Sequence, residues 1–246
     1  IYLIETAEKG IEWMKLTAHG LAGHGSMVNR ENAVTRLADA ISRIGNYTWP
    51  QRITKTNEAF LKKVAELTGK KYDSNDLKPV LDELGSISRM LGATLNNSAN
   101  PSMLEAGYKA NVIPQTASAV VDGRTLPGYE KELIDTVKLL AGEHVTVESL
   151  VSDIPLEVDF SGPLVDRMIE AIKAEDPEGI PVPYVMSGGT DNKALAKLGL
   201  AGYGFSPLKL PPELDFLALF HGVDERVPVD SLTFGARSLQ HFLANA

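Results

Sequence analysis

The stretch IEWMKLTAHGLAGHGSMVNRENAVTRLADAISRIG, residues 11–45, contains the change of hydrophobic period that decides the fold around it. Residues 11–19 alternate between two faces, as a half-buried strand does. A glycine-rich turn follows, and a helix then opens at residues 29–31 and runs through Ile44 until Gly45 ends it. This segment therefore predicts a strand, a turn and an amphipathic helix in direct succession.

The chain beyond this helix continues as an α+β domain. The apolar spacing predicts helices over 53–68, 77–91 and 129–141, and strands over 102–111, 117–126 and 145–151. The first two of these strands form a hairpin with Pro114 in its turn, because proline cannot donate to a sheet ladder. The order strand, helix, strand, strand, helix, strand is ferredoxin-like. Residues 10–152 are thus expected to form one domain, with a helical insertion at about 50–100.

From Leu156 the pattern changes to alternating helices and strands. We expect helices over 163–174, from Asp191 and over 230–243, with strands over 181–186 and 200–205. Few strands among several helices are typical of the last part of a parallel α/β sheet. Residues 153–246 are therefore expected to form an α/β unit whose earlier strands lie elsewhere.

The composition argues against several classes of function. The formal net charge is −8 and the chain has no run of Lys and Arg, which argues against binding nucleic acid or an anionic membrane through bulk electrostatics. There is no cysteine, so a transition metal would have to be held by His and carboxylates.

Three features bear on the chain's origin and location. No apolar run approaches the roughly 20 residues that cross a bilayer, and no secretion signal opens the chain. With the lack of cysteine, these features favour a cytoplasmic protein. Because the chain begins without Met, directly in a strand-like segment at Ile1, we expect a processed or truncated piece.

Four stretches, in order along the chain, resemble one family of zinc-dependent amide hydrolases. They are AGHGSMVNRENAVTRLADAI (22–41), NVIPQTASAVVDGRTLPG (111–128), SGGTDNKALAKLGL (187–200) and FHGVDERVPVDSL (220–232). The chain is similar to the superfamily of aminoacylase, carboxypeptidase G and succinyl-diaminopimelate desuccinylase. In that family a lid domain inserted into the zinc-peptidase domain forms a homodimer. The resemblance implies that residues 10–152 are the lid, and that residues 1–9 and 153–246 belong to the catalytic domain.

The resemblance assigns roles to two histidines. His221 matches the last metal ligand of the family, and Asp224 or Glu225 could orient its ring. His24 matches the lid histidine that reaches into the partner's site and hydrogen-bonds the substrate carbonyl as it becomes an oxyanion. The alternatives are a histidine near a helix start for His221 and one in a surface turn for His24.

Asn111 and Arg124 match family residues that hold the substrate's carboxylate. About eight residues at roughly 3.3 Å each would separate them along one hairpin, which is too far for one small carboxylate. Either they serve different parts of the site, or the dimer brings one from each subunit. The alternatives are a surface ion pair for Arg124 and a turn-stabilising side chain for Asn111.

The motif SGGTDNK predicts a substrate-binding turn formed by Gly188, Gly189 and Thr190, because glycines let backbone N–H groups approach a ligand at the rim of an α/β sheet. Asp191 is expected to cap the helix that it begins. Lys193 falls where relatives of the family often have Arg.

The family's two-metal centre also needs a His-x-Asp motif and an adjacent Glu-Glu pair, and the chain contains neither. We therefore expect this chain alone to be inactive and to bind no stoichiometric zinc, since catalytic zinc normally takes three protein ligands. For the parent protein the resemblance implies zinc-dependent hydrolysis of N-acyl amino acids or short peptides with a free carboxylate.

Two other classes are weighed against this hydrolase. The chain could be a dimerisation or binding module without catalytic activity, which upstream His-x-Asp and Glu-Glu motifs would argue against. A serine hydrolase is disfavoured, because the chain has no Gly-x-Ser-x-Gly elbow, and a His-Glu-x-x-His zinc helix is absent too.

Overall fold

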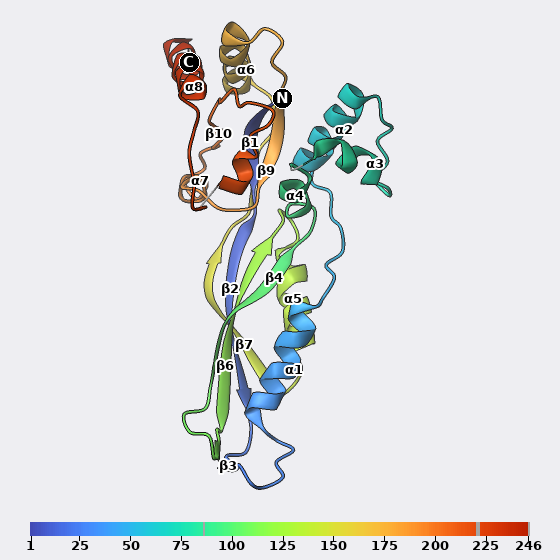
Figure 1. Ribbon diagram of the computed structural model, residues 1–246, viewed down its shortest axis with the longest axis vertical. Helices are drawn as coiled ribbons and strands as arrows, with labels where there is room; N and C mark the ends of the chain where they lie inside the picture. Colours follow the sequence, from blue (N-terminus) through green and yellow to red (C-terminus); the bar gives the residue numbers. More distant parts are fainter. Residues whose placement is uncertain (86, 220–221, 246) are drawn as a thin grey trace. The chain divides into compact units, whose positions relative to one another are not determined.

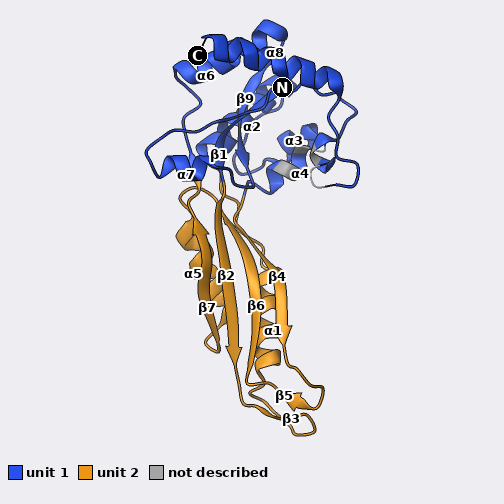
Figure 2. Cartoon of the chain, turned by 90° about the vertical axis from the view of Figure 1, so that its left-hand side faces the viewer, with its two compact units in different colours: residues 1–8, 53–95, 156–246 blue, residues 9–52, 96–155 orange. Residues whose placement is uncertain are grey.

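The computed structural model describes residues 1–85, 87–219 and 222–245 (Figure 1). The chain divides into two compact units, which Figure 2 colours separately. The first unit contains Ile1–Glu8, Ile53–Leu95 and Leu156–Ala246, and the second contains Lys9–Arg52 and Asn96–Pro155.

The second unit is a four-stranded antiparallel sheet with two helices. Its strand order is β4-β6-β2-β7, and the chain runs β2, α1, β4, β6, α5, β7. The bounds are β2 (Gly10–His19), α1 (Ala33–Gly45), β4 (Ser98–Ala106), β6 (Thr116–Thr125), α5 (Glu130–Ala141) and β7 (Val145–Asp153).

The core of this unit follows the period-two pattern of β2. Met14, Leu16 and Ala18 are buried, whereas Trp13 and Lys15, which alternate with them, are exposed. The buried face packs with the apolar stripe of α1 and with residues of β6, α5 and β7 in one cluster. At the start of α1 the Asn32 side chain accepts a hydrogen bond from the Val34 N–H, so the helix begins later than residues 29–31.

The hairpin after the helical segment differs from the expectation. The strand expected over 102–111 lies at β4, Ser98–Ala106, and is mostly exposed, so no alternation revealed it. The chain then turns at Gly107, whose φ of 70° favours glycine. A short strand β5 (Val112–Ile113) follows and pairs with β3 (Gly23–His24) in a separate small sheet.

The first unit is built on β1 (Tyr2–Glu8), which has three neighbours. It pairs parallel with β9 (Pro181–Met186) and antiparallel with β8 (Leu156–Glu157) and β10 (Gly204–Phe205). The strand expected over 200–205 is thus only the two residues of β10.

Helices cover both faces of β1 and β9. One face packs against α6 and α8 through a cluster that includes Tyr2, Ile4 and Met168. The other packs against the helical segment that follows Arg52, through a cluster that includes Leu3 and Val182. The bounds are α2 (Lys55–Thr68), α3 (Lys78–Leu81), η1 (Asp82–Leu84), α4 (Ile87–Gly92), α6 (Pro163–Glu175), α7 (Asn192–Ala196), η2 (Phe216–Leu219) and α8 (Val229–Asn245).

The helical segment differs in its packing from the expected insertion at about 50–100. Residues 53–95 do interrupt the second unit in the chain, but they pack in the first unit. The reason is that Phe60, Leu61 and Val64 of α2 are buried against Val182 of β9 in one cluster. Local periodicity predicts such a helix but not the sheet that covers its apolar face.

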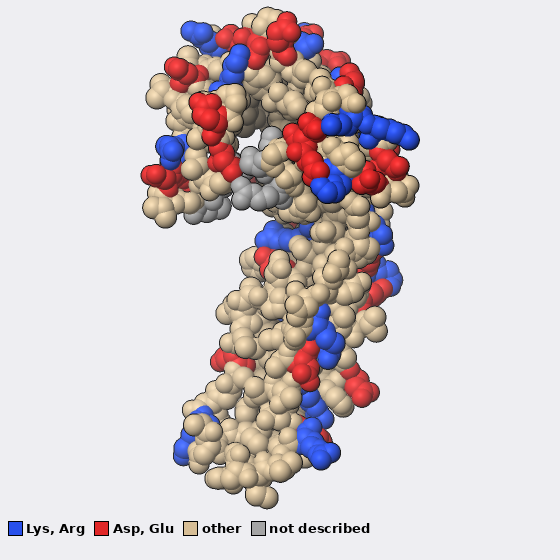
Figure 3. All heavy atoms as spheres, turned by 45° about the vertical axis from the view of Figure 1, so that its right-hand side comes forward, with Lys and Arg blue, Asp and Glu red and all other residues tan. Residues whose placement is uncertain are grey.

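Two further features are the distribution of charge on the surface and the length and hydropathy of the helices. On the face drawn in Figure 3, Lys and Arg side chains lie among Asp and Glu side chains and not in one patch. In the part of the chain that the structure describes, no helix combines the length and the hydropathy needed to span a bilayer.

Two carboxylic acids of β1, Glu5 and Glu8, are buried inside the first unit, with 2% and 1% of their surfaces exposed. Burial, together with a hydrogen bond to Glu8 and repulsion by its charge, raises the pKa of Glu5 to about 8, although Lys193 lowers it in part. Glu5 is therefore neutral at pH 7, and its carboxyl O–H can donate a hydrogen bond to Glu8.

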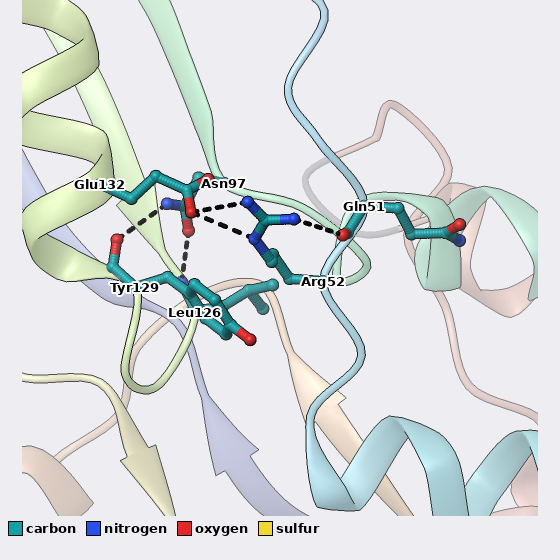
Figure 4. Close-up of polar contacts among 6 residues, drawn as sticks. All are labelled: Gln51, Arg52, Asn97, Leu126, Tyr129 and Glu132. Atoms are coloured by element: carbon teal, nitrogen blue, oxygen red, sulfur yellow. Dashed lines mark hydrogen bonds and ion pairs between the residues drawn. The ribbon is translucent and has the colours of Figure 1, made fainter. Parts of the chain in front are cut away.

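A buried asparagine forms hydrogen bonds with the backbone of the turn between β6 and α5 (Figure 4). The Asn97 side chain accepts the Leu126 N–H at 2.8 Å and donates to the Tyr129 carbonyl at 2.9 Å. Beside it, Arg52 donates twice to one Glu132 oxygen, at 3.1 and 3.0 Å. Because backbone groups buried without partners are costly, this asparagine stabilises the turn between strand and helix.

We predict that Asn97→Ala destabilises the chain, because the Leu126 N–H and the Tyr129 carbonyl lose their partners. Each buried group left unpaired costs about 1–3 kcal/mol. Urea unfolding followed by circular dichroism measures the loss. The matched control is Asn100→Ala, at an exposed position of β4. A change below about 0.5 kcal/mol for Asn97→Ala, the range of ordinary surface substitutions, would contradict the prediction.

A second prediction concerns Glu5→Gln, which keeps a donor toward Glu8 but cannot ionise. Folded Glu5 holds its proton up to about pH 8, whereas an ordinary glutamate releases it near 4.5. Between these values unfolding releases a proton, so the free energy of unfolding falls as the pH rises. The variant loses this decline, and its stability relative to the wild type should increase from about pH 5 to about pH 8.

Urea unfolding at a series of pH values tests the Glu5 prediction. The control is Glu170→Gln on α6, where the carboxylate pairs with Arg167 and the side chain is 54% exposed. Parallel stability profiles for Glu5→Gln and the wild type would show that Glu5 does not retain its proton.

Candidate functional site

His24 lies on the short strand β3 and is exposed. Its Nδ1 accepts the Ser26 backbone N–H at 3.2 Å and lies 2.8 Å from the Ser26 Oγ. Since Nδ1 is an acceptor, the proton of the neutral ring sits on Nε2. His24 therefore offers an exposed N–H donor, which is the group needed to stabilise an oxyanion.

Asn111 lies next to His24. The Gly25 N–H donates to the Asn111 carbonyl at 2.9 Å, and His24 pairs with Val112 in the small sheet. Asn111 is exposed, so its side-chain amide faces solvent close to the histidine. The structure thus brings these two predicted residues together at one end of the second unit.

An open pocket of about 470 Å³ adjoins His24. Leu21, Met27, Val28 and Ile113 contribute apolar side chains to its lining. These apolar groups beside a donor histidine suit a ligand with one polar and one apolar part.

Arg124 lies toward the other end of the same sheet. In β6 it opposes Ile11, whereas Thr116, at the start of the strand, opposes His19 near the His24 loop. The eight steps along the strand from Thr116 to Arg124 span about 26 Å at roughly 3.3 Å per residue. Within one chain, Arg124 and Asn111 therefore do not meet, as the hairpin geometry predicts.

The Arg124 side chain is already occupied. Its Nε and Nη2 donate to the two oxygens of Asp122 at 2.7 and 3.1 Å, and Trp13 also donates to Asp122. Residues 122 and 124 share a face of the strand because side chains alternate. Asp122 uses the Nε and one Nη2 donor of Arg124, so a carboxylate ligand would have to bind through the other N–H groups or replace Asp122.

The turn with Gly188, Gly189 and Thr190 lies in the first unit, directly after β9. β1 and β9 run parallel with Glu8 opposite Met186, so the turn follows the carboxyl ends of both strands. Ligands of open α/β sheets bind at this edge. A side chain at 188 would make only ordinary contact, 3.7 Å to Met186, so the fold itself does not require glycine there.

Glu8 is a buried residue beside this turn that sequence reasoning did not single out. It accepts the Thr190 N–H at 2.9 Å and the Thr190 hydroxyl, and Lys193 Nζ lies 3.4 Å from its Oε2. Burial alone would raise the pKa of Glu8, but hydrogen bonds from Thr190 and Glu5 and the charge of Lys193 hold it below its ordinary value. The available signal was two acidic residues inside an apolar strand.

One expectation about α7, the cap by Asp191, differs from the structure, and the surroundings of Lys193 are now defined. Lys193 is 2% exposed and pairs with Glu8, so its ammonium is not on the surface. Asp191 occupies the N-cap position without a side-chain capping bond. Thr190 Oγ1 instead accepts the Asn192 N–H at 3.2 Å.

The predicted metal ligand His221 lies outside the described residues. Of its suggested partners, Asp224 pairs with Arg226 at 3.4 Å. Among the residues that the structure does describe, no group of three or more His, Asp or Glu side chains could hold a metal ion.

Comparison with known proteins gives the family. Residues 6–145 match the peptidase dimerisation domain of the M20 peptidases. "Probable carboxypeptidase S-like 2" of Dictyostelium discoideum is 28% identical over 90% of this chain and 44% of its own length. "N-fatty-acyl-amino acid synthase/hydrolase PM20D1" of Xenopus tropicalis is 28% identical over 94% of this chain and 47% of its own length. The chain thus spans about half the length of the curated relatives that it matches.

A solved structure shows the same fold. The M20 family metallo-carboxypeptidase from Sulfolobus solfataricus superposes with a TM-score of 0.67 at 19% identity, over 99% of this chain and 60% of that one. The dimerisation domain match covers more than half of the chain. The chain therefore belongs to the M20 metallopeptidase superfamily, whose peptidase dimerisation domain it carries.

Proposed function

We propose that the chain supplies the substrate-binding and oxyanion-stabilising part of a metal-dependent hydrolase of amide bonds in N-acyl amino acids or short peptides. The observation that carries this is the match, along nearly the whole chain, to relatives named as N-fatty-acyl-amino acid synthase/hydrolase and as probable carboxypeptidase S-like protein. Because the chain spans about half of those relatives, the activity of the whole protein is part of the proposal.

His24 is proposed as the oxyanion donor, acting on the substrate bound by a partner subunit. Its exposed position on β3 and its Nε2 proton support this role. As water attacks the amide carbon, the carbonyl oxygen gains negative charge, and a donor already oriented toward it lowers the barrier. Ser26 holds the ring, so little reorganisation is needed.

Substrate binding is proposed at three places. Asn111, beside His24, would bind a polar group near the reacting carbonyl, and the pocket's apolar side chains suit the acyl group. The turn of Gly188, Gly189 and Thr190 would hold the amino acid part through backbone N–H groups. Arg124 would bind a carboxylate through N–H groups that Asp122 does not use, or in place of Asp122. With about 26 Å of strand between Arg124 and Thr116, at the end of β6 near Asn111, we assign Arg124 and Asn111 to different parts of the site or to different subunits.

Zinc is proposed as the metal on the resemblance around His221. The described side chains do not fit a zinc centre by themselves, since no three of the suitable groups gather. The steps derived for this chain therefore use its own donors only: His24 stabilises charge, and Asn111, Arg124 and the glycine turn orient the substrate.

We predict that His24→Ala lowers kcat for an N-acyl amino acid by about 10²–10³ with little change in KM, because it removes a donor that acts in the transition state. The assay uses the full-length gene product with zinc or cobalt added and a panel of N-acyl amino acids. His144→Ala is the control, an exposed histidine of the same unit.

Two results would count against this function. Equal kcat values for His24→Ala and wild type would remove the oxyanion role. A metal-loaded gene product that dimerises but hydrolyses no member of the panel would favour the alternative, a dimerisation or binding module.

A homodimer is proposed through the second unit, whose ferredoxin-like arrangement is supported by its strand order. Among the described strands, β4 pairs only with β6, so its other edge is unpaired. Met103 and Leu104 on β4 are 66% and 63% exposed. An open edge with exposed apolar side chains is a template for pairing with a second strand. We assign this edge to a second copy of the chain.

We predict that Leu104→Lys weakens the dimer at least about tenfold, because a charge on the edge opposes strand pairing. Sedimentation at a series of concentrations measures the dissociation constant. Leu150→Lys is the matched control on β7, the opposite edge, where Leu150 is 52% exposed. A larger effect of Leu150→Lys, or a wild type that stays monomeric, would contradict pairing through β4.

A further inference from the structure

Glu5 and Glu8 share a face of β1 because the strand is irregular. In a regular strand, residues three apart point to opposite faces. The pairing of β1 with β9 shifts register between Glu5 and Ala7, as a bulge does. One extra residue reverses the alternation beyond it, and this turns Glu8 to the face of Glu5.

The space for this pair is provided by β10. A Cβ at Gly204 would lie 2.5 Å from Oε2 of Glu5, so no residue larger than glycine fits there without moving the carboxyl group. Tyr184 of β9 is the other titratable group nearby, and burial followed by the two carboxyl groups raises its pKa, so it stays neutral. At this cluster Lys193 pairs with Glu8, with Nζ 3.4 Å from Oε2.

Glu8 connects this interior cluster to the surface turn. Both of its oxygens are used by Thr190: Oε2 accepts the backbone N–H and Oε1 accepts the hydroxyl. Thr190 in turn accepts the Asn192 N–H, and a Cβ at Gly202 would lie 2.3 Å from the Asn192 side chain. Hence Glu8 fixes this segment through Thr190, and close packing against Gly202 fixes it through Asn192.

The chemistry of these bonds favours a rigid turn. Hydrogen bonds to an ionised carboxylate are about twice as strong as neutral ones, and two of them to one residue define both position and direction. Removing the charge would leave the Thr190 N–H with a weaker acceptor and Lys193 without the charge of Glu8.

We propose that Glu8 is a positioning residue of the candidate site: through Thr190 its carboxylate holds the Gly188–Gly189–Thr190 turn in the conformation that binds substrate, while Glu5 donates to it from the interior. The substrate role of the turn rests on the proposed function. The positioning itself does not, and it can be measured in the absence of substrate.

The test is amide hydrogen exchange of this chain, resolved by residue with NMR. In Glu8→Gln the Thr190 amide should exchange at least about tenfold faster than in the wild type, with no comparable change along β9. Thr190→Val removes only the hydroxyl from an exposed residue and should give a smaller acceleration, and Thr190→Ser should restore the wild-type rate. If Glu8→Gln fails to fold, Thr190→Val and Thr190→Ser still decide the question.

Controls for these variants come from the same unit. Glu170→Gln matches Glu8→Gln, and Thr233→Val removes an exposed threonine hydroxyl from α8 that donates to the Val229 carbonyl. Neither control should change exchange in the turn. An unchanged Thr190 amide in both Glu8→Gln and Thr190→Val, or equal acceleration along β9 and the turn, would overturn the proposal.

A kinetic arm separates this proposal from the proposed function. In the full-length gene product, Thr190→Val should raise KM about tenfold and leave kcat within about twofold, and Thr190→Ser should restore KM. A wild type that hydrolyses no N-acyl amino acid rejects the proposed function, while the exchange result still stands. If the wild type is active but Glu8→Gln does not change the exchange rates of the turn amides, only the positioning role is rejected.

Discussion

The first unit depends on how β1 accommodates two carboxyl groups in its interior. The bulge between Glu5 and Ala7 places both on one face, where one is neutral and the other is ionised beside Lys193. The pairing of Glu8 with Lys193 and the hydrogen bonds from Thr190 satisfy the Glu8 carboxylate, which limits the desolvation cost of its burial. With a regular β1 the two acids would point into opposite apolar layers.

This arrangement links the core of the first unit to its surface chemistry. Glu8 ends β1, and the glycine turn follows the parallel neighbour β9, so the same edge of the sheet carries both. A residue 182 positions before Thr190 in the chain thereby sets the backbone of the turn. The buried carboxylate of Glu8 is therefore hydrogen-bonded directly to the turn of the candidate substrate site.

In the second unit, the sheet determines how far apart the candidate site residues lie. The unbroken antiparallel pairing of β2 with β6 keeps the two ends of β6 apart, so His24 and Asn111 lie at one end and Arg124 lies toward the other. No rearrangement of a single hairpin brings these groups to one small carboxylate. This geometry explains why the proposed function distributes the three residues over different parts of the site or over two subunits.

Much of the second unit could be predicted from local pattern. The alternation in β2 and the helical spacing in α1 follow directly from which side chains are apolar. β4 was misplaced because it is mostly exposed and has no period to detect. The helical segment 53–95 was recognised as helical, but the sheet that buries its apolar face belongs to the first unit.

The sequence by itself determined the family motifs, the donor residues His24, Asn111 and Arg124, and the succession of strands and helices, because these depend on neighbours in the chain. Only the tertiary structure decided that Arg124 pairs with Asp122, that Ser26 leaves the His24 proton on Nε2, and that Glu8 holds Thr190. Local sequence specifies which groups a residue carries. Whether a carboxyl group is charged, and what it binds, depends on burial and on partners brought together by folding.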